Sequence, residues 1–561
     1  MTFYQSPPKM GHPYLTDRLL GEYVQRHLPR EMREVVEPEY ITLGEQVRDE
    51  LFPYALANRL EKPELVQWDA WGHRVDNIRV PAAWEKYAKI ATEQGLIWRG
   101  YDSPYGELAR TDQFLRAYLL DRVTHTYNCP LAMTDGTTRT LLTHGSDELK
   151  KRALPHLLNR TPGAAWTAGQ WMTERTGGSD VGISETKAVN TGDGWKLYGT
   201  KWFTSATTSE LALTLARPEG NPPGGRGLAL FYVEQRDSKG QLQGIRVNRL
   251  KEKLGTWMLP TAELTLDGVP AVPVAGLDNG VRNITPLLNV TRTWNSVCAV
   301  ASMRHGIRLA KDYAQHRVAF GSPISKQPLH MDTLAGMQAE FEAAFHLTFT
   351  QVRLLGKSDQ GTLSENDSKA LRLLFPLVKL STARMAVANA SESLEAFGGA
   401  GYVEDTGLPQ LLRDTQVLSI WEGTTNVLSL DGLRAIAKED ALSAYLTLMK
   451  QWVDETTEPE AQTYAQQALS VAKTAAGWLQ AHATDRGSLE AGARRFALTM
   501  SRTMALVLMA NHASWATTTQ GTPGASMAAM RRFAAHGVDL MASQGISQED
   551  SAILSQDTRN S

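Results

Sequence analysis

The stretch Trp195-Lys-Leu-Tyr-Gly-Thr-Lys-Trp-Phe203 has the aromatic content and the alternating polarity that are typical of a β-strand. Three further stretches share this pattern: residues 211–216, 227–233 and 261–266. A period of two indicates strands with one buried face and one solvated face. We therefore predict a β domain over residues 165–276.

Helical spacing replaces this alternation on both sides of the predicted β domain. Pro81-Ala-Ala-Trp84 is typical of a helix start. Further along, Met337, Phe341 and Phe345 fall on one face of a long helix, as in the core of a helical bundle. We therefore predict an α+β multidomain chain. Its segments are an N-terminal arm (1–45), an N-terminal helical domain (46–164), the β domain (165–276), a C-terminal helical bundle (277–435) and a helical extension (436–561).

The composition is that of an ordinary soluble globular protein, with 42% hydrophobic and 21% charged residues over 561 positions. A net charge of −2 provides no overall polycation to drive binding to nucleic acid. Cys129 and Cys298 are the only cysteines, which excludes a disulfide framework and a cysteine-rich zinc site and suits a reducing compartment. The N-terminus lacks the apolar core of a signal peptide, and no apolar run approaches the roughly 20 residues of a membrane-spanning helix. We expect a cytoplasmic location, no membrane association and no metal ion.

One carboxylate stands out in the segment Ser419-Ile-Trp-Glu-Gly-Thr-Thr-Asn426. Glu422 is placed between the apolar ring of Trp421 and the flexible Gly423. An apolar wall disfavours the charged carboxylate and raises its pKa, as a general base requires, and glycine lets a ligand approach the backbone. A glutamate that opens a helix can also be a solvated first-turn residue favoured by the helix dipole. The segment alone leaves both interpretations open.

Four further segments carry residue types suited to an anionic or planar ligand. They are Trp171-Met-Thr-Glu-Arg-Thr-Gly-Gly-Ser-Asp180, Lys201-Trp-Phe-Thr-Ser205, Arg317-Val-Ala-Phe-Gly-Ser-Pro-Ile-Ser-Lys-Gln327 and Phe397-Gly-Gly-Ala-Gly-Tyr402. The first offers converging backbone N–H groups for a phosphate, and the second a flat ring beside two hydroxyls. The third offers a cation, an aromatic ring and an amide. The fourth exposes backbone donors but follows a helix and lacks the last glycine of a dinucleotide fingerprint. Taken singly, each is equally explained by a turn, a strand aromatic or a helix end.

The order of these five segments on a helix–strand–helix chain resembles that of the acyl-CoA dehydrogenase flavoproteins, over about residues 80–435. The resemblance is closest to the AidB-like branch of that family. It is carried by Asp69-Ala-Trp-Gly-His-Arg-Val-Asp76, Pro81-Ala-Ala-Trp84, Cys129-Pro-Leu-Ala-Met-Thr-Asp135, Gly177-Gly178 and Trp421, and by the C-terminal helical extension. The fold that it implies has an N-terminal helical domain, a central antiparallel β domain and a C-terminal four-helix bundle followed by the extension.

The resemblance implies an extended FAD between the β domain and the C-terminal helices. Its implied contacts on the first segment are Met172, Thr173, Gly178 and Ser179. On the second segment, Trp202 is implied to flank the isoalloxazine ring and Thr204 to lie near N5 and O4, with Ser205 beside them. Trp421, Thr424 and Asn426 are implied to close over the cofactor. A second implied set reaches the FAD of a neighbouring subunit: Arg317, Phe320, Gln327, Gly398 and Gly399. The implied active unit is therefore at least a dimer, and we expect a homotetramer.

The implied reaction is the α,β-dehydrogenation of an acyl-CoA thioester. Glu422 would remove the α proton while a hydride leaves the β carbon for flavin N5, and the Glu422 N–H would polarise the thioester carbonyl. Arg292 resembles a family arginine near the substrate mouth. The sequence departs from the common pattern at three places. Arg175-Thr176 stand where most relatives have Pro-Gly, and the segment from Arg317 to Gln327 is one residue shorter than usual. Thr291 stands where some relatives place an alternative base.

Two alternatives remain open at this stage. The first is an AidB-like flavoprotein associated with DNA in the response to alkylation stress, with little or no dehydrogenase activity. Residues 441–561 carry nine basic and ten acidic side chains, so they lack the positive excess that phosphate binding favours. The second is a flavin oxidase on the same scaffold, since the sequence does not identify the electron acceptor.

Overall fold

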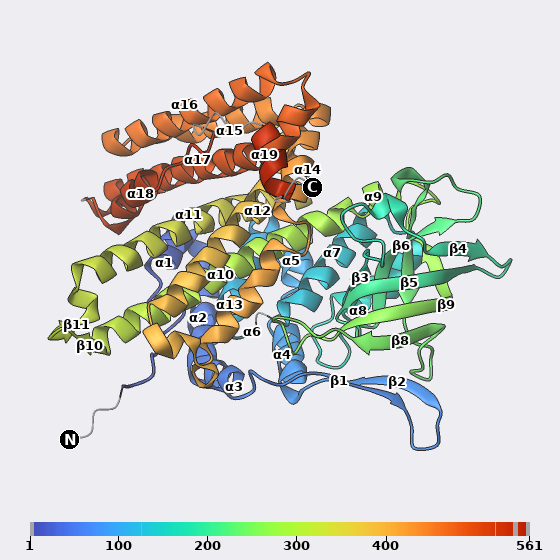
Figure 1. The fold of residues 1–561 in the computed structure, drawn as a ribbon. Coiled ribbons are helices and arrows are strands. Elements are labelled where there is room, and N and C mark those ends of the chain that lie inside the picture. Colours follow the sequence, from blue (N-terminus) through green and yellow to red (C-terminus); the bar gives the residue numbers. More distant parts are fainter. Residues whose placement is uncertain (1–4, 125, 522, 542–547, 557–561) are drawn as a thin grey trace.

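The computed structural model describes residues 5–124, 126–521, 523–541 and 548–556. Its N-terminal part is helical, with one hairpin that reaches out beneath the β domain (Figure 1). The elements are α1 (Arg18–His27), α2 (Arg30–Gln46), α3 (Phe52–Ala57), β1 (Glu64–Trp68), β2 (Arg74–Arg79), α4 (Ala82–Glu93), α5 (Arg99–Asp102), α6 (Ala109–Thr124), α7 (Asn128–His144) and α8 (Asp147–Leu157).

The central part is a seven-stranded sheet. Its strands are β3 (Ala168–Trp171), β4 (Lys187–Asn190), β5 (Trp195–Ser205), β6 (Leu211–Pro218), β7 (Ala229–Glu234), β8 (Ile245–Leu250) and β9 (Thr261–Pro273). The sheet curls round on itself, since β6 pairs with β4 and also with β7, which pairs with β9. Most neighbours are antiparallel as predicted, but β6 is parallel to both β3 and β4, which a sequence period of two does not indicate.

A buried ion pair fixes the loop that leaves β3. Lys201 Nζ on β5 lies 2.8 Å from Glu174 Oε1 and donates a second bond of 2.9 Å to the carbonyl of Leu215. Both side chains are almost fully buried, and Glu174 also accepts bonds from Thr186 Oγ1 and from the N–H of Glu185. The pair therefore holds residues 174–186 against the sheet.

The C-terminal part begins with long helices that pack side by side (Figure 1). Met337, Phe341 and Phe345 are buried on α11, as the apolar spacing predicts. A two-stranded hairpin projects between α10 and α11. The elements are α9 (Gly280–Asn283), α10 (Thr285–His316), β10 (Val318–Ala319), β11 (Ser322–Pro323), α11 (Pro328–Asp359), α12 (Glu365–Glu395), α13 (Leu408–Gln416) and α14 (Thr425–Glu439).

The helical extension covers the outer side of this bundle (Figure 1). It packs mainly through α15 on α12 and through α17 on α11 and α14. None of the helices in the described residues combines the length and the apolar character needed to cross a membrane. The extension comprises α15 (Ala441–Asp454), α16 (Pro459–Ala481), α17 (Arg486–Gln520), α18 (Ala525–Ala535) and α19 (Gln548–Gln556).

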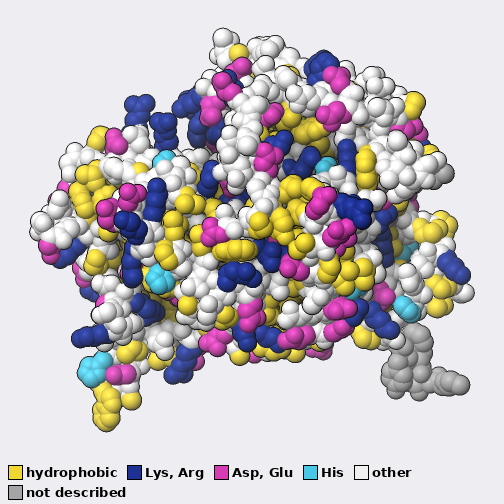
Figure 2. All heavy atoms as spheres, turned by 180° about the vertical axis from the view of Figure 1, so that it is seen from behind, with side chains coloured by type: hydrophobic (Ala, Val, Ile, Leu, Met, Phe, Trp, Pro, Cys, Tyr) yellow, Lys and Arg dark blue, Asp and Glu magenta, His cyan; other side chains and the backbone are white. Residues whose placement is uncertain are grey.

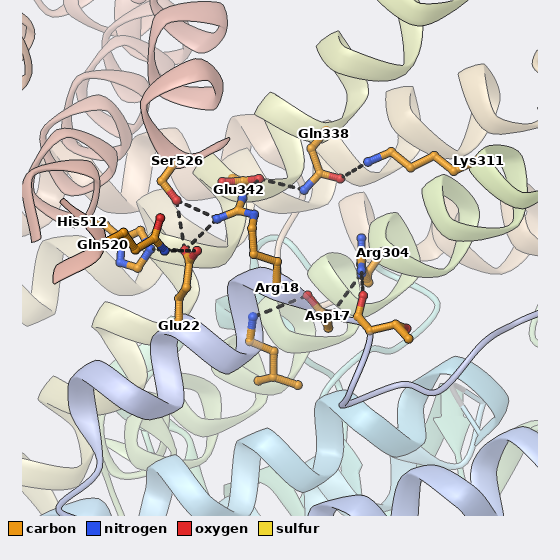
Figure 3. A network of polar contacts seen from close by, with 12 residues as sticks. Asp17, Arg18, Glu22, Arg304, Lys311, Gln338, Glu342, His512, Gln520 and Ser526 are labelled. Atoms are coloured by element: carbon orange, nitrogen blue, oxygen red, sulfur yellow. Dashed lines mark hydrogen bonds and ion pairs between the residues drawn. The ribbon is translucent and has the colours of Figure 1, made fainter. Parts of the chain in front are cut away.

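Helix α1 of the N-terminal arm joins the bundle to the extension (Figure 3). Arg18 pairs with Glu342 on α11 and donates to Ser526 on α18. Glu22 accepts bonds from Arg18, from His512 on α17 and from Ser526. The arm therefore packs on elements of its own chain through charged side chains drawn from both ends of the sequence.

The Lys201–Glu174 pair predicts a strong asymmetry between a single and a double substitution. Lys201→Met leaves the Glu174 carboxylate buried without its cation, and breaking such a pair costs about 3–5 kcal/mol. Lys201→Met combined with Glu174→Gln removes both charges, so we expect a much smaller cost. Thermal and guanidinium unfolding of the two variants and the wild type measure the difference. A single variant as stable as the wild type would contradict this account of the loop.

Candidate active site

A cavity of about 1980 Å³ lies where the β domain, α7, α10 and the segment before α14 meet. Its wall includes Met172 and Ser179 from the β domain, Cys129 from α7, and Thr291 from α10. Glu422 lies in the same wall. Pockets for small ligands are usually about 300–1,000 Å³, so this cavity has room for a large cofactor together with a second molecule.

The backbone of Glu422 is in the left-handed region, with φ of 58°. L-residues rarely adopt this conformation, which costs roughly 1–3 kcal/mol and persists only where the surroundings enforce it. Gly423 follows with φ of 102°, which glycine adopts without that cost. The chain therefore makes a tight turn at Glu422, directly before α14 begins.

The carboxyl group of Glu422 is an acid with a raised pKa. Burial raises the pKa above its ordinary value, and this effect exceeds three that lower it. The opposing effects are a hydrogen bond of 2.6 Å from Thr291 Oγ1 to Glu422 Oε2 and the positive charges of Arg292 and Lys379. The result is a carboxyl group poised to take up a proton inside a cavity, as a general base must be.

Neighbouring side chains hold the turn in place. Lys379 Nζ on α12 donates to the carbonyls of Trp421 and Gly423 at 2.6 and 2.7 Å, on either side of Glu422. Trp421 Nε1 donates to Asn295 Oδ1 on α10 at 2.5 Å, so the indole ring is fixed as well. Three contacts from two long helices thus set the conformation of the segment.

Arg292 lies next to Glu422 on the cavity wall. Its Nε is 3.4 Å from the carbonyl oxygen of Glu422, and its Nη1 is 2.9 Å from Asp431 Oδ2 on α14. Arg372 Nη2 approaches the other oxygen of Asp431 at 2.7 Å. Burial raises the pKa of Asp431, but the two guanidinium groups outweigh it and hold that pKa below its ordinary value. Asp431 is therefore an anion that orients Arg292, whereas the pKa of the neighbouring Glu422 is raised.

The structure brings together four of the residues predicted to contact FAD on the β domain. Met172, Thr173, Gly178 and Ser179 all line the cavity. Gly178 is tightly placed, because a Cβ there would lie 2.5 Å from Thr173 Oγ1. Any side chain at this position would displace Thr173 from the cavity wall.

Strand β5 presents Phe203 and Ser205 to the cavity, and not Trp202 or Thr204. Lys251 Nζ lies 3.7 Å from the centroid of the Trp202 ring, and Thr204 is fully buried with its hydroxyl donated to the carbonyl of Ala262. The reason is a bulge in the β5–β9 pairing between Lys201 and Thr204, which shifts the faces of the strand by one residue. The cavity wall therefore contains the predicted Ser205, lacks the predicted Trp202 and Thr204, and has Phe203 where an aromatic ring was expected.

Five predicted residues lie away from the cavity of their own chain: Arg317, Phe320, Gln327, Gly398 and Gly399. The first three belong to the β10–β11 hairpin and its exit, at the end of the molecule opposite the β domain (Figure 1). The Phe320 side chain is 99% exposed, and both glycines are exposed at the end of α12. Arg317 and Gln327 are half-buried in the single chain, and Gln327 Nε2 donates to Ser322 Oγ at 2.8 Å, so only Phe320 and the two glycines of this set are exposed.

The residues after Glu422 divide between the cavity and the surface. Thr424 lines the cavity and caps α14 by accepting a bond from the N–H of Val427. Asn426 is exposed on α14, and its Oδ1 is 3.3 Å from Arg494 Nη1 of the extension. Trp421 lines the cavity as well, next to Glu422.

Lys379 contacts the segment around Glu422, and the sequence prediction lacks it. A signal for it exists, because it is the one charged residue in the apolar run from Leu373 to Leu380 of α12. An apolar run in a bundle helix predicts a fully buried segment. A lysine within such a run must find acceptors inside the protein, and those acceptors are the carbonyls beside Glu422.

Three family models match the chain. Residues 169–269 match the middle domain of acyl-CoA dehydrogenases, and residues 278–437 match their C-terminal domain. Residues 5–161 match the N-terminal domain of the adaptive response protein AidB. Together with the relatives below, these matches show that the chain belongs to the acyl-CoA dehydrogenase family, whose members depend on FAD.

Two relatives and one solved structure are the most informative comparisons within that family. Acyl-CoA dehydrogenase family member 11 from Caenorhabditis elegans is 41% identical over 529 residues, which are 91% of this chain and 86% of the relative. Putative acyl-CoA dehydrogenase AidB from Escherichia coli K12 is 31% identical over 396 residues, 68% of this chain and 71% of the relative. The crystal structure of C. elegans ACDH-11 in complex with C11-CoA superposes with a TM-score of 0.92 at 37% identity, covering 100% of this chain and 97% of the other.

The cavity wall fits the cofactor that the family uses. Besides the apolar Met172 and Phe203, the wall contains polar side-chain atoms that have no hydrogen-bond partner among the described residues, and Gln170 Oε1, Asn289 Oδ1 and Asn295 Nδ2 are among them. Buried polar atoms are nearly always paired in folded proteins. Unpaired acceptors and donors beside an aromatic ring are what a flavin, with its polar ring edges and planar face, would satisfy.

The raised pKa predicts how Glu422→Gln changes the stability of the ligand-free protein. The pKa of Glu422 in the folded protein lies above its ordinary value of about 4, so this carboxyl group ionises at a lower pH in the unfolded chain than in the folded chain. The folding stability of the wild type therefore falls as the pH rises from about 4 to beyond the raised pKa. Glutamine cannot ionise, so we expect the variant to unfold at a higher temperature near neutral pH. We expect the two proteins to converge below about pH 4.

Thermal unfolding of both proteins over this pH range measures the effect. Glu395→Gln, at an exposed position of α12, is the control and is expected to follow the wild type. Equal unfolding temperatures for Glu422→Gln and the wild type at every pH would show that the carboxyl group has no raised pKa.

Proposed function

We propose that the chain catalyses the FAD-dependent α,β-dehydrogenation of an acyl-CoA thioester, with Glu422 as the base. The observation that carries the proposal is the carboxyl group of Glu422, which has a raised pKa and lies in a cavity large enough for a cofactor and a substrate. Membership of the acyl-CoA dehydrogenase family supports the same reaction. The complex of C. elegans ACDH-11 with C11-CoA supports an acyl-CoA as the substrate class.

Glu422 would act on the proton next to the thioester carbonyl. Its carboxylate takes the α proton and becomes neutral, which its raised pKa favours. Thr291 Oγ1, 2.6 Å from Glu422 Oε2, holds the carboxyl group in one orientation during this transfer. Bound FAD supplies the acceptor for the hydride that leaves the β carbon, at flavin N5. The electron pair of the broken Cα–H bond then forms the Cα–Cβ double bond.

The β domain would hold the cofactor. We assign the stacking contact with the flavin to Phe203 and a hydroxyl contact to Ser205, because both line the cavity. Met172 and Thr173 would meet the ring edge, and Gly178 and Ser179 would bind the pyrophosphate through backbone N–H groups and a hydroxyl. Trp421 and Thr424 would close the opposite wall. Arg292 would stay beside the base and face the substrate.

We propose an assembly of at least two subunits, and a homotetramer as the active form. The support is the β10–β11 hairpin, where Phe320 is almost fully exposed although it is aromatic and has a φ of 51°. Arg317 and Gln327 flank it, and Gly398 and Gly399 are exposed as well. A strained, exposed aromatic residue at a hairpin tip is suited to contact another molecule. In an assembly it would reach the FAD site of a neighbouring subunit.

The surface charges of the helical extension do not favour association with DNA. Two of the basic residues of the extension are neutralised in the fold, since Arg531 pairs with Glu460 and Arg532 pairs with Asp332. Figure 2 shows Lys and Arg side chains interspersed with Asp and Glu over one face of the molecule. A binding face for a duplex would need a continuous basic surface.

If Glu422 is the base, its substitution should abolish the reaction without affecting the binding of FAD. Glu422→Gln keeps the shape of the side chain but cannot accept the α proton, so we expect purified variant to retain FAD and its yellow colour. Anaerobic addition of acyl-CoAs should bleach the wild-type flavin and leave the variant oxidised, with a rate at least 1,000-fold lower. Glu395→Gln, at an exposed position, is the matched control. A variant that bleaches at the wild-type rate would exclude Glu422 as the base.

The bulge in β5 predicts opposite results for two neighbouring aromatic residues. Phe203→Ala removes the ring that lines the cavity, and an aromatic side chain contributes about 1.5–3 kcal/mol when buried. We expect FAD to dissociate at least tenfold more readily from this variant. Trp202→Ala should retain FAD, since Trp202 lies outside the cavity. Equilibrium dialysis with FAD measures both. The reverse outcome would restore Trp202 as the flavin neighbour.

A further inference from the structure

Lys379 is the most unusual charged group outside the predicted site. Its side chain is fully buried in α12, and among the described residues no carboxylate oxygen lies within 4.0 Å of its Nζ. Burial of an unpaired ammonium in this way is costly. An ordinary core position of a bundle helix would be filled by an apolar residue, so the charge needs a specific explanation.

The explanation lies in where the ammonium donates its hydrogen bonds. Both acceptors are backbone carbonyls, those of Trp421 and Gly423, and the residue between them is Glu422. The backbone φ angles are 58° at Glu422 and 102° at Gly423, and the two carbonyls converge on one side of this turn, where both accept from Lys379 Nζ. A single cation at that point fixes both peptide groups and with them the direction of the Glu422 side chain.

We infer that Lys379 is a positioning residue for Glu422: its ammonium group holds the left-handed turn that aims the carboxylate into the cavity and stabilises the ionised form of that carboxylate. The inference rests on the proposed function of Glu422 as the base. Lys379 does not line the cavity, so it acts on the reaction through Glu422 alone.

The charges that face Lys379 define how its effect depends on pH. Glu422 on the turn favours the protonated lysine, whereas Arg292 on α10 disfavours it. Burial is the largest influence and lowers the pKa of Lys379 to about 7. The ammonium is therefore present below about pH 7 and is lost as the pH rises through that value. The carboxylate of Glu422, in contrast, forms only as the pH rises.

The decisive variant is Lys379→Met, which keeps the length of the side chain and removes both the donors and the charge. We expect it to retain FAD and to bind a non-oxidisable thioether analogue of an acyl-CoA within about threefold of the wild-type Kd. We expect the rate of anaerobic bleaching to fall at least tenfold, because the base is no longer held in place. Lys369→Met, on the exposed side of the same helix, is the matched control and should bleach at the wild-type rate.

The pH profile separates positioning from a general loss of packing. Since the charge of Lys379 lowers the pKa of Glu422, removing it should move the acid limb of the bleaching rate to higher pH. Lys379→Arg keeps a cation and several donors, and is expected to return the limb toward its wild-type position. A slower Lys379→Met enzyme with an unmoved acid limb would overturn the inference, as would an unchanged rate.

A second measurement needs no activity and tests the coupling in ligand-free protein. We expect Glu422→Gln to be more stabilising near neutral pH in the Lys379→Met background than in the wild type, because the buried carboxylate has then lost its cation. Additive effects in this double-mutant cycle would overturn the inference even if Lys379→Met cannot bind FAD. If no acyl-CoA bleaches the wild type, the proposed function fails, and this cycle still decides whether Lys379 acts on Glu422.

Discussion

The carboxylate of Glu422 lies in a cavity wall where burial disfavours its charge, and most features of the site follow from that constraint. Burial raises the pKa of Glu422, and the neighbouring groups offset this rise only in part. They are one hydroxyl donor at 2.6 Å and two cations that do not pair with the carboxylate directly. Full pairing would have made Glu422 a structural anion such as Asp431, which two guanidinium groups hold with a lowered pKa. Both acids are in the cavity wall, and their opposite pKa shifts are why we propose Glu422 as the base and Asp431 as a support.

The site exists only when distant parts of the chain meet. The β domain contributes Met172, Thr173 and Ser205, α10 contributes Thr291 and Arg292, and the turn before α14 contributes Glu422. Helix α12 adds Arg372 and Phe375 to the cavity wall, and its Lys379 fixes the turn from outside the cavity. The long helices thus act as a rigid frame, which a site built on loops alone would lack.

The sequence allows the fold class and the base to be predicted because both depend on local patterns. The strands of β5, β6, β7 and β9 are long enough for alternation to be recognised, whereas β3 and β4 span only four residues each and offer too few positions. Glu422 is recognisable from its neighbours Trp421 and Gly423 and from its order among the other segments. Two results lie beyond a local pattern. The bulge near Lys201 exchanges the faces of Trp202 and Phe203, and nothing in the five-residue motif reveals it. The partner of Lys379 is 42 residues away from it, at Trp421, so only the folded chain brings them together.

The contacts of helix α1 bear on how the protein reaches its native state. His512 and Ser526 follow Arg18 and Glu22 by roughly 500 positions, so they are synthesised much later. Until then Glu22 lacks two of its native partners, and the loop that must close to supply them spans roughly 500 residues. Helix α1 can therefore complete its native contacts only after α17 and α18 have been made.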